Sequence, residues 1–511
     1  MKYYITTPIY YVNDTPHIGH AYTTVAADIL ARWHRLKGDD VFFLTGTDEH
    51  GAKIAQAAAN SNQTPKELCD KVSEEFKIAW KSLNITNSSF IRTTDLYHKT
   101  TVELFLKTLF EKDMIYKKKY EGLYCVHCEK FLKKDDLDEN LCCPDHKQKP
   151  VEHSEENYFF RLSSFQDRLL ELLSNKKHPN YMEILPESRR NEVLGKLKLG
   201  LDDISISRKA ILWGIPLPFD ESQTAYVWVD ALLNYLSGAG FGQDEENFKK
   251  TWPCDTHLMA KDILWFHGVI WPAMLLAIDL PLPKKLFAHG FFTINNEKMS
   301  KTLGNVIKPA ELIQKFGVDA SRYLLVSLFP FGSDGDISWE ALTNKFNTDL
   351  ANNLGNLVSR TLTMIEKYFA GTIPAPVAPI RGIKEVFNIK ELNDYLENFQ
   401  FHFALEAIQK HINNANQFIE ETAPWKMAKE NNKELSNVLW ALVEQIKIAA
   451  VSLYPIMPET SKKIWAQIGE TKSIKEDAVL FFNGFPVSAP ASGSKINKAS
   501  GLFPRIDKNL K

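Results

Sequence analysis

The first 33 residues constrain the fold more than any other part of the chain. Residues 3–11 are rich in aromatic and β-branched side chains, which predicts a buried β-strand. Apolar residues then recur at helical spacing over residues 21–33, which predicts a helix. The stretch Pro-His-Ile-Gly-His at 16–20 lies between them. A strand therefore passes directly into a helix, with two histidines and a glycine at the junction.

This junction has the composition of a phosphate-binding helix start. We predict Thr15 as the N-cap and Pro16 as the first helical residue. A helix N-terminus attracts phosphate through its free N–H groups and its dipole. Gly19 has no Cβ and would let a base or phosphate approach the backbone, while His17 and His20 could donate hydrogen bonds to phosphate oxygens. A capped helix with two solvated histidines explains the local pattern equally well.

A second unit of the same kind follows. The short apolar run 41–44 predicts a buried strand, and helical patterns follow at 52–60 and 65–83. This alternation predicts an α/β domain with a Rossmann-type parallel sheet. Ligands of such sheets bind at the carboxyl ends of the strands, where Tyr11 and Asp48 both fall. Asp48 could alternatively serve only as a helix cap.

Composition narrows the class of protein. The 511 residues carry a formal net charge of −2. This excludes the class of proteins that coat nucleic acid through a large excess of positive charge. The start of the chain shows no signal peptide, and Pro272 and Asp279 interrupt the longest apolar run, at 269–282. We therefore expect a cytoplasmic protein that does not bind membranes.

The cysteines predict a metal site. Cys125-x-x-Cys128 and Cys143-x-x-His146 have the spacing of a closed tetrahedral zinc site, which is structural because four protein ligands leave no open position. Cys142 could replace Cys143, but the Cys-x-x-His spacing favours Cys143. Reduced cysteines in a loop are the alternative.

Two later groups of residues in the α/β part of the chain stand out. Trp228 and Tyr235 fall at predicted sheet ends, where they are either core or the walls of a small-molecule pocket. Lys298 and Lys301 lie among small polar residues, which fits a phosphate clamp or, for this motif alone, a solvated turn.

From about residue 349 to residue 468 the pattern is helical. Asn356 and Arg360 are four residues apart and so share a helix face. Trp425 follows Pro424, where it is either a core residue or an exposed stacking platform. An all-α domain is thus appended to the α/β domain.

Taken together, the motifs are much more specific than any one of them. Their order, from the His-x-Gly-His stretch to the Lys-Met-Ser-Lys motif, resembles class I aminoacyl-tRNA synthetases, and the intervening motifs at 45–51 and 226–231 closely resemble the methionyl-tRNA synthetase family. The resemblance runs from Lys2 to about Pro458. Thr302 stands where the family usually has serine, which preserves the hydroxyl group.

The resemblance implies that methionine is activated with ATP and then transferred to tRNA(Met), both initiator and elongator. By this analogy His17 and His20 contact the ATP phosphates, Gly19 admits the adenosine, and Lys298 and Lys301 close on the pyrophosphate. Mg²⁺ would accompany the ATP. The segment inserted between the two halves of the α/β domain, residues 116–223, is too short for the large hydrolytic domain of the isoleucine, valine and leucine enzymes. This favours methionine as the substrate.

The resemblance also implies two further sets of contacts. The positions that match the family's methionine pocket are Pro8, Ile9, Tyr11, Asp48, Trp228, Tyr235, Asp262 and His267, with Asp48 on the ammonium group. In the helical domain, Asn356, Arg360 and Trp425 match the positions that read the CAU anticodon.

We therefore expect a Rossmann-type catalytic domain with a zinc-bearing insertion, followed by an all-α anticodon-binding bundle. The expected segments are 1–115 and 224–295 for the two catalytic halves, 116–223 for the insertion, 296–348 for the lysine loop and stem-contact region, 349–490 for the bundle and 491–511 for a basic tail. The chain ends soon after the bundle, so we expect a monomer.

Two alternatives remain at this point. A nucleotidylyltransferase also uses a His-x-Gly-His junction, but it needs neither the helical domain nor the zinc insertion. A non-catalytic zinc protein that binds RNA would need neither the lysine loop nor the aromatic pocket.

Overall fold

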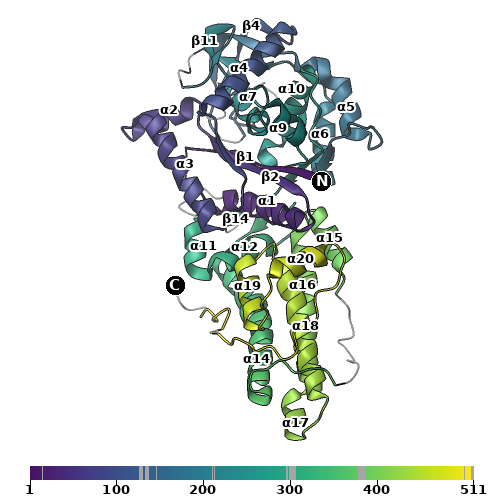
Figure 1. Ribbon diagram of the computed structural model, residues 1–511. Helices are drawn as coiled ribbons and strands as arrows, with labels where there is room; N and C mark the ends of the chain where they lie inside the picture. Colours follow the sequence, from purple (N-terminus) through teal and green to yellow (C-terminus); the bar gives the residue numbers. More distant parts are fainter. Residues whose placement is uncertain are drawn as a thin grey trace.

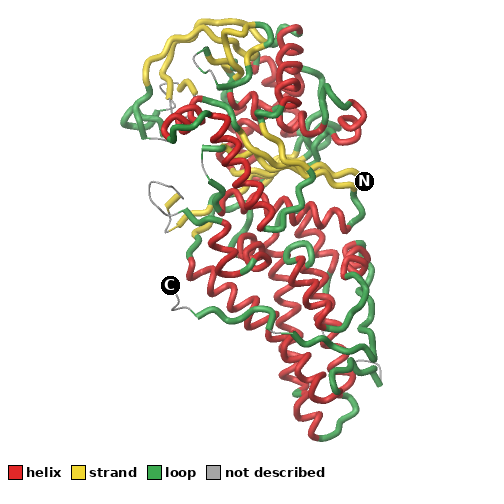
Figure 2. Tube along the Cα trace, turned by 60° about the vertical axis from the view of Figure 1, so that its left-hand side comes forward, coloured by secondary structure: helices red, strands yellow, loops and turns green. Residues whose placement is uncertain are grey.

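The fold places an α/β domain above a long helical domain (Figure 1). The computed structural model describes residues 1–13, 15–125, 130–132, 137–144, 147–209, 211, 213–294, 297–298, 306–377, 387–499 and 501–507. Figure 2 shows that strands are confined to the upper part, whereas the long lower part is built from helices and loops. The division into an α/β and an all-α domain is as predicted.

A six-stranded parallel sheet forms the centre of the α/β domain, in the order β3-β2-β1-β12-β13-β7. Its strands are β1 (Lys2–Tyr11), β2 (Asp40–Asp48), β3 (Ser89–Arg92), β7 (Glu183–Leu185), β12 (Thr256–Ala260) and β13 (Lys285–His289). From β1 the chain proceeds outward through β2 to β3, while β12 and β13 extend the sheet on the other side. The boundary between β1 and β12 is therefore the switch point at which such sheets bind ligands.

Helices follow these strands, and they include the three that the sequence predicted at 21–33, 52–60 and 65–83. They are α1 (Ile18–Leu36), α2 (Ala52–Asn60), α3 (Pro65–Ser82), α4 (Leu96–Glu111), α5 (Gln166–Ser174), α6 (Glu187–Leu197), α7 (Val227–Leu232), α8 (Asn234–Ala239), α9 (Glu245–Thr251) and α10 (Trp271–Ala277). Thr64 caps α3 and forms a reciprocal pair with Glu67. The predicted apolar stripe of α1 is fully buried.

The segment between the two halves forms small antiparallel sheets. One has the order β5-β4-β6-β8, with β4 (Ile115–Cys125), β5 (Lys130–Leu132), β6 (Val151–Phe160) and β8 (Ile204–Ser205). A second joins β9 (Ser207–Arg208), β10 (Pro216–Leu217) and β11 (Asp220–Ala225). Strand β7 also comes from this segment, yet it pairs with β13 and forms an edge of the main sheet.

A third small sheet leads towards the helical domain. It joins β14 (Phe292–Ile294), β15 (Glu297–Lys298) and β16 (Gly335–Asp336). Between β15 and β16 the chain forms helices α11 (Pro309–Phe316) and α12 (Val318–Ser327). After β16 come α13 (Trp339–Lys345) and the π-helix η5 (Phe346–Gly355), which continues into the bundle.

The bundle contains α14 (Asn356–Phe369), α15 (Ile389–Glu397), α16 (Phe401–Thr422), α17 (Pro424–Lys429), α18 (Leu435–Leu453), α19 (Pro458–Gln467) and α20 (Ile474–Phe482). Among the residues that the structure describes, no helix combines the length and the apolar character needed to cross a membrane.

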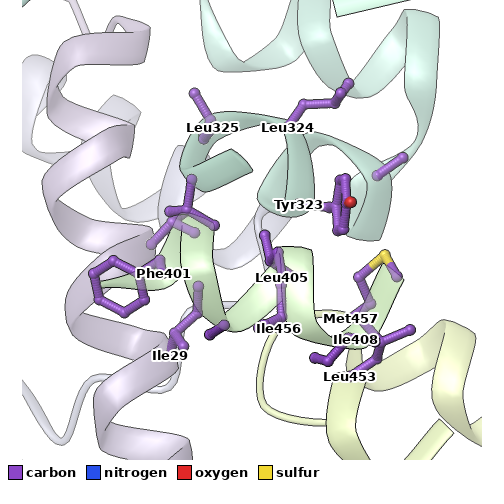
Figure 3. Close-up of a cluster of buried hydrophobic side chains, with 14 of the residues drawn as sticks. Ile29, Tyr323, Leu324, Leu325, Phe401, Leu405, Ile408, Leu453, Ile456 and Met457 are labelled. Atoms are coloured by element: carbon purple, nitrogen blue, oxygen red, sulfur yellow. The ribbon is translucent and has the colours of Figure 1, made fainter. Parts of the chain in front are cut away.

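The two domains share one hydrophobic core. Figure 3 shows side chains from four parts of the chain packed together: Ile29 of α1, Leu324 of α12, Leu405 of α16 and Ile456 at the end of α18. All four are at most 2% exposed. Residues more than 400 positions apart therefore belong to the same packed interior.

A buried ion pair crosses this core. The Arg322 guanidinium lies 2.8 Å from an Asp28 carboxylate oxygen, and both side chains are fully buried. Arg322 also donates to the carbonyl oxygens of Leu83, Pro455 and Ile456, at 3.1, 3.2 and 2.8 Å. The pair thus joins α1, α12 and the turn between α18 and α19.

Candidate active site and anticodon-binding surface

A cavity of about 450 Å³ opens at the carboxyl ends of β1, β2, β12 and β13. It lies at the switch point of the sheet. Eleven residues predicted to bind ATP or methionine line it: Pro8, Ile9, Tyr11, His17, Gly19, His20, Asp48, Trp228, Tyr235, Asp262 and His267. The cavity therefore brings together residues that are up to 259 positions apart in the sequence.

The start of α1 differs from the prediction. The N-cap is His17, not Thr15, and the helix begins at Ile18, so Pro16 precedes it. The His17 ring accepts a hydrogen bond from the Gly19 N–H at 3.1 Å. In return the His20 ring accepts one from the His17 N–H, at 3.3 Å. The histidines themselves form a reciprocal capping pair, a role that Ser, Thr, Glu or Gln usually fills.

This pairing fixes the proton positions on both rings. Because each Nδ1 accepts from a backbone N–H, the proton of each neutral ring must sit on Nε2. The rings stack, with centroids 3.7 Å apart. Burial, together with the adjacent His17, holds the pKa of His20 well below 6.5, so this ring is neutral at pH 7. His20 is thus a neutral N–H donor and not a cation.

The far end of the cavity holds a hydrogen-bonded pair. Tyr235 Oη lies 2.8 Å from His267 Nε2, and His267 Nδ1 lies 3.0 Å from the carbonyl oxygen of Ile263. A carbonyl only accepts, so Nδ1 carries the proton and Tyr235 donates to Nε2. Burial lowers the pKa of His267 to about 4 and raises that of Tyr235, so both groups are neutral. His267 lies on the π-helix η4 (Phe266–Ile270), a helix type often found at functional sites.

Aromatic and acidic side chains also line the cavity. The Trp228 ring stacks on Phe266, with centroids 4.0 Å apart and planes within 11°. Asp48 ends β2 beside Tyr11 of β1, and the two residues are paired in register. The N-cap of α2 is Gly51, without a side-chain cap bond, so Asp48 does not serve as the cap of that helix.

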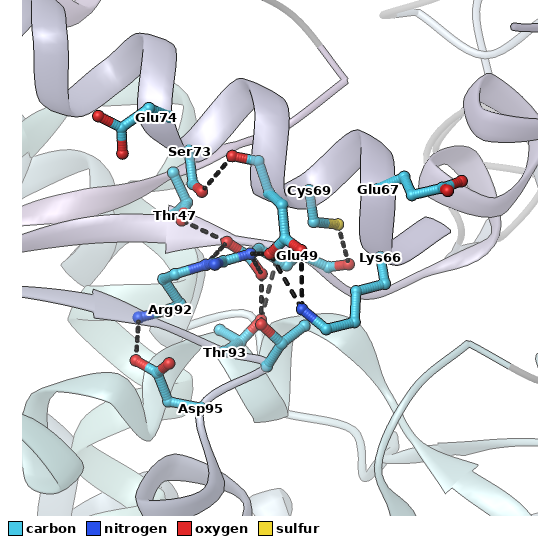
Figure 4. A network of polar contacts seen from close by, with 12 residues as sticks. Thr47, Glu49, Lys66, Glu67, Cys69, Ser73, Glu74, Arg92, Thr93 and Asp95 are labelled. Carbon is cyan, nitrogen blue, oxygen red and sulfur yellow. Dashed lines mark hydrogen bonds and ion pairs between the residues drawn. The ribbon is translucent and has the colours of Figure 1, made fainter. Parts of the chain in front are cut away.

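A buried network holds the residue next to Asp48 (Figure 4). Glu49 is fully buried and accepts two hydrogen bonds from Arg92, at 2.7 and 3.0 Å. Thr47 and Thr94 also donate to the Glu49 carboxylate, at 2.7 and 2.5 Å. The Glu49 N–H donates to Thr93 at 2.9 Å. Every oxygen of this buried carboxylate is therefore satisfied, and the end of β2 is held in place.

Sequence reasoning missed several cavity residues. His289 ends β13 and lines the cavity; its Nε2 lies 2.6 Å from Thr23 Oγ1, and its Nδ1 lies 2.7 Å from the Gly290 carbonyl oxygen. Burial lowers its pKa to about 4. Lys53, on the first turn of α2, brings a cation to the same cavity. The position of His289 at a strand end was a usable signal, whereas Lys53 had no distinguishing pattern.

The lysine clamp and half of the predicted zinc ligands fall outside the described residues. Lys301, Cys128 and His146 are among the undescribed residues, and for Lys298 the structure gives the backbone of β15 but not the side chain. Cys125 and Cys143 are buried together in a small cluster, whereas Cys142 is partly exposed. Within the described residues, no group of three or more potential ligands forms a metal site.

Of the three predicted anticodon residues, Asn356 and Arg360 lie on α14 and Trp425 lies on α17, and α17 forms the tip of the bundle away from the α/β domain (Figure 1). The Arg360 guanidinium lies 5.7 Å from the centre of the Trp425 ring and pairs with Glu420 at 2.6 Å. Asn356 donates to Asn416 at 3.3 Å. All three side chains are half-buried, so each keeps an accessible face.

Comparison with known proteins matches both domains to known families. The family described as tRNA synthetases class I (M) matches residues 3–149 and 135–362, and an anticodon-binding domain of tRNA ligase matches residues 388–503. The α/β domain thus matches a tRNA synthetase family, and the helical domain matches an anticodon-binding domain, which a nucleotidylyltransferase does not need.

The sequences of individual relatives align with nearly the whole chain. Methionine–tRNA ligase of Caldanaerobacter subterraneus is 46% identical over 99% of this chain and 79% of its own length. The Streptomyces coelicolor ligase is 42% identical over 99% of this chain and 97% of its own length.

Solved structures support the same relationship. The Mycobacterium tuberculosis methionyl-tRNA synthetase in complex with methionyl-adenylate is 38% identical, with a TM-score of 0.90 over 99% of this chain and 100% of that chain. Its apo form has a TM-score of 0.85 over 99% of both chains. The chain belongs to the methionine–tRNA ligases, within the class I tRNA synthetases.

Proposed function

We propose that the cavity at the switch point catalyses attack of the methionine carboxylate on the α-phosphate of ATP, and that the methionyl group then passes to the 3′-terminal adenosine of tRNA(Met). The observation that carries this proposal is one cavity lined by all eleven nucleotide and methionine candidates whose side chains the structure describes. The reaction needs no protein nucleophile, because the substrate carboxylate itself attacks. The residues therefore act by positioning and by stabilising phosphate charge.

His17 and His20 would bind the phosphates as neutral donors. Because the capping pair uses both Nδ1 atoms, the Nε2–H groups are the donors that would meet the phosphates. Gly19 leaves room for the nucleotide beside the helix, and Lys298 and Lys301 would close on the pyrophosphate from the other side. Mg²⁺ enters this scheme together with ATP, as the counter-ion of the triphosphate.

Methionine would lie with its ammonium group on Asp48 and its side chain between the aromatic walls. Methionine sulfur is polarizable and gains energy against aromatic rings such as Trp228. The thioether only accepts hydrogen bonds, and His267 has no proton left on Nε2. Tyr235 is thus the one residue of the pair that can donate to the sulfur, in exchange for its bond to His267.

The experiment that tests the function is amino-acid-dependent ATP–pyrophosphate exchange, measured with each of the twenty amino acids. We expect exchange with methionine to exceed exchange with every other amino acid. Exchange with none of them, or stronger exchange with a different one, would contradict the proposal. The cytoplasm, where tRNA is charged, is the location that fits this activity.

We also propose a structural zinc ion in the insertion, held by Cys125, Cys128, Cys143 and His146. The burial of Cys125 and Cys143 in one cluster supports this set, and the outward position of Cys142 supports Cys143 as the ligand. Bound zinc would tie together two turns of a segment that has little hydrophobic core of its own.

Replacing Cys143 by serine should therefore abolish bound zinc, whereas Cys142→Ser should retain it. Zinc content per chain, measured by atomic emission on the purified proteins, distinguishes the two variants. Loss of zinc in Cys142→Ser with retention in Cys143→Ser would reverse the assignment. Absence of zinc from the native protein would remove the proposed site altogether.

The bundle tip is proposed to read the anticodon. Unpaired anticodon bases can stack on Trp425 and accept hydrogen bonds from Arg360 and Asn356. The pairing of Arg360 with Trp425 and Glu420 holds the guanidinium at this surface before tRNA binds.

Trp425→Ala should raise KM for tRNA(Met) in aminoacylation by about 10- to 100-fold, because stacking on an aromatic ring is worth about 1–3 kcal/mol per base. Methionine-dependent pyrophosphate exchange should change little, since the cavity lies at the other end of the molecule. Trp425→Phe keeps a ring and should lose less. An equal loss of both activities in Trp425→Ala would instead assign Trp425 a structural role.

A further inference from the structure

We infer that His50, Asp230 and His98 form a positioning cluster that fixes the distance between the ammonium-binding and side-chain-binding parts of the methionine site. The inference rests on the proposed function of the cavity, and it concerns residues that lie behind the cavity wall. The three side chains come from separate places: His50 follows β2, His98 lies on α4, and Asp230 lies on α7.

The Asp230 carboxylate bridges the two histidine rings. His50 Nδ1 lies 2.7 Å from one Asp230 carboxylate oxygen, and His98 Nε2 lies 2.7 Å from the other. Because a carboxylate only accepts, both rings donate to it. The three side chains are between 0 and 4% exposed, which makes these bonds costly to break. His98 Nδ1 continues the chain to Ser237 Oγ of α8, at 2.9 Å.

The bridge joins two elements that each carry a substrate contact. His50 is two residues from Asp48, the proposed ammonium ligand, and the intervening Glu49 is held from another direction by Arg92. Asp230 is two residues from Trp228, on the same short helix. The His50–Asp230 bond is therefore a direct link between the strand end that holds the ammonium group and the helix that carries the aromatic wall.

This link has a consequence for specificity. The ammonium group and the thioether are at opposite ends of methionine, so the separation of Asp48 and Trp228 defines the length of amino acid that fits. Binding to a pocket wall alone discriminates one methylene by only about 10- to 200-fold, so a site that must measure length depends on a fixed separation. A misplacement of about 1 Å can cost about 100-fold in rate.

The test is Asp230→Asn, which keeps the size of the side chain. Its amide has one oxygen and one NH₂ group, so only one of the two rings can keep donating, and the other ring must lose its bond or move its proton to its other nitrogen. We expect kcat/KM for methionine in pyrophosphate exchange to fall by about 10- to 100-fold, mainly through KM, with KM for ATP changed by less than about twofold. Preference for methionine over S-methylcysteine and ethionine, which are one methylene shorter and longer, should fall by at least about fivefold.

Two further comparisons separate positioning from a general role in folding. His50→Leu should reproduce the Asp230→Asn phenotype, whereas His50→Asn, whose amide can donate from near the Nδ1 position, should restore most of the methionine KM. Ser237→Ala is the matched control, because it leaves both bonds to Asp230 intact, and it should change methionine kinetics by less than about twofold. Thermal unfolding of each variant reports whether the chain still folds.

The outcome is decided by the pattern of kinetic effects. Equal changes in KM for ATP and methionine, or an unchanged preference among the three amino acids, would overturn the positioning role while native methionine-dependent exchange still supported the function. Absence of methionine-dependent exchange in the native protein would instead contradict the function itself.

Discussion

Replacing His20 by alanine should reduce kcat for methionine-dependent pyrophosphate exchange by about 10²- to 10³-fold. Removal of one preorganised donor to developing charge costs about 2.7–4 kcal/mol in other enzymes. Under the proposed function His20 would supply such a donor, because its Nδ1 accepts from the His17 N–H, its proton therefore lies on Nε2, and the residue lines the cavity. Stopped-flow or exchange kinetics at saturating ATP and methionine measure this loss directly.

Because His20 also closes the capping pair, the alanine variant should lose about 1 kcal/mol of stability as well. His20→Glu provides the control: glutamate at this helical position can accept from the N-cap N–H as His20 does, but it brings no donor. Its stability should therefore be close to that of the native protein while its activity stays low. A variant of either kind with less than a tenfold loss of kcat would rule out a phosphate-stabilising role for His20.

The second large effect is expected at Asp28, on stability. Asp28→Asn should lower the free energy of unfolding by about 3–5 kcal/mol, because it removes the carboxylate that pairs with the fully buried Arg322 guanidinium. Asp28 also accepts from Arg32 at 2.7 Å and from the Thr86 N–H at 2.6 Å. Although burial alone would raise the pKa of Asp28, Arg322 and Arg32 outweigh it and lower the pKa. Urea titration followed by tryptophan fluorescence measures the change.

Glu459→Gln is the control for this measurement. It removes an ion pair with Lys462 in which both side chains are about half exposed, and such pairs contribute only about 0–1 kcal/mol. The double variant Asp28→Asn/Arg322→Met should recover part of the lost stability, since it removes the uncompensated charge. Full recovery is not expected, because Arg322 also donates to three carbonyl oxygens. A loss below about 1 kcal/mol in Asp28→Asn would show that the pair contributes little.

Local patterns predicted the elements of this protein well, because each pattern has a local cause. Continuous apolar runs predicted β1 and β2, and helical spacing predicted α1 and the bundle helices. The start of α1 was placed two residues too early because Thr15 and Pro16 are common at helix starts, whereas a histidine capping pair is not. Nothing local distinguishes β7, whose partner β13 is about a hundred residues away.

The candidate site was predictable to the extent that it depends on motifs. Resemblance supplied the residues that face the cavity, such as Asp48 and Trp228, because their order along the chain is specific. It did not supply Arg92, which binds Glu49 just after β2, or His98, which binds Asp230 of α7. These two residues lie on separate elements with no motif around them, and only the folded chain brings them next to the site.

The shared core between α1, α12 and α16 also has a consequence for how the protein selects RNA. A hinge between two domains needs an interface that can slide, but here the same packed side chains and one buried ion pair belong to both sides (Figure 3). The distance and angle between the cavity and the bundle tip are therefore set when the chain folds. In the proposed function, a tRNA whose anticodon is bound at the bundle tip reaches the cavity only if its own arms have the matching angle and length. Overall tRNA shape thus becomes a criterion of selection alongside the anticodon bases.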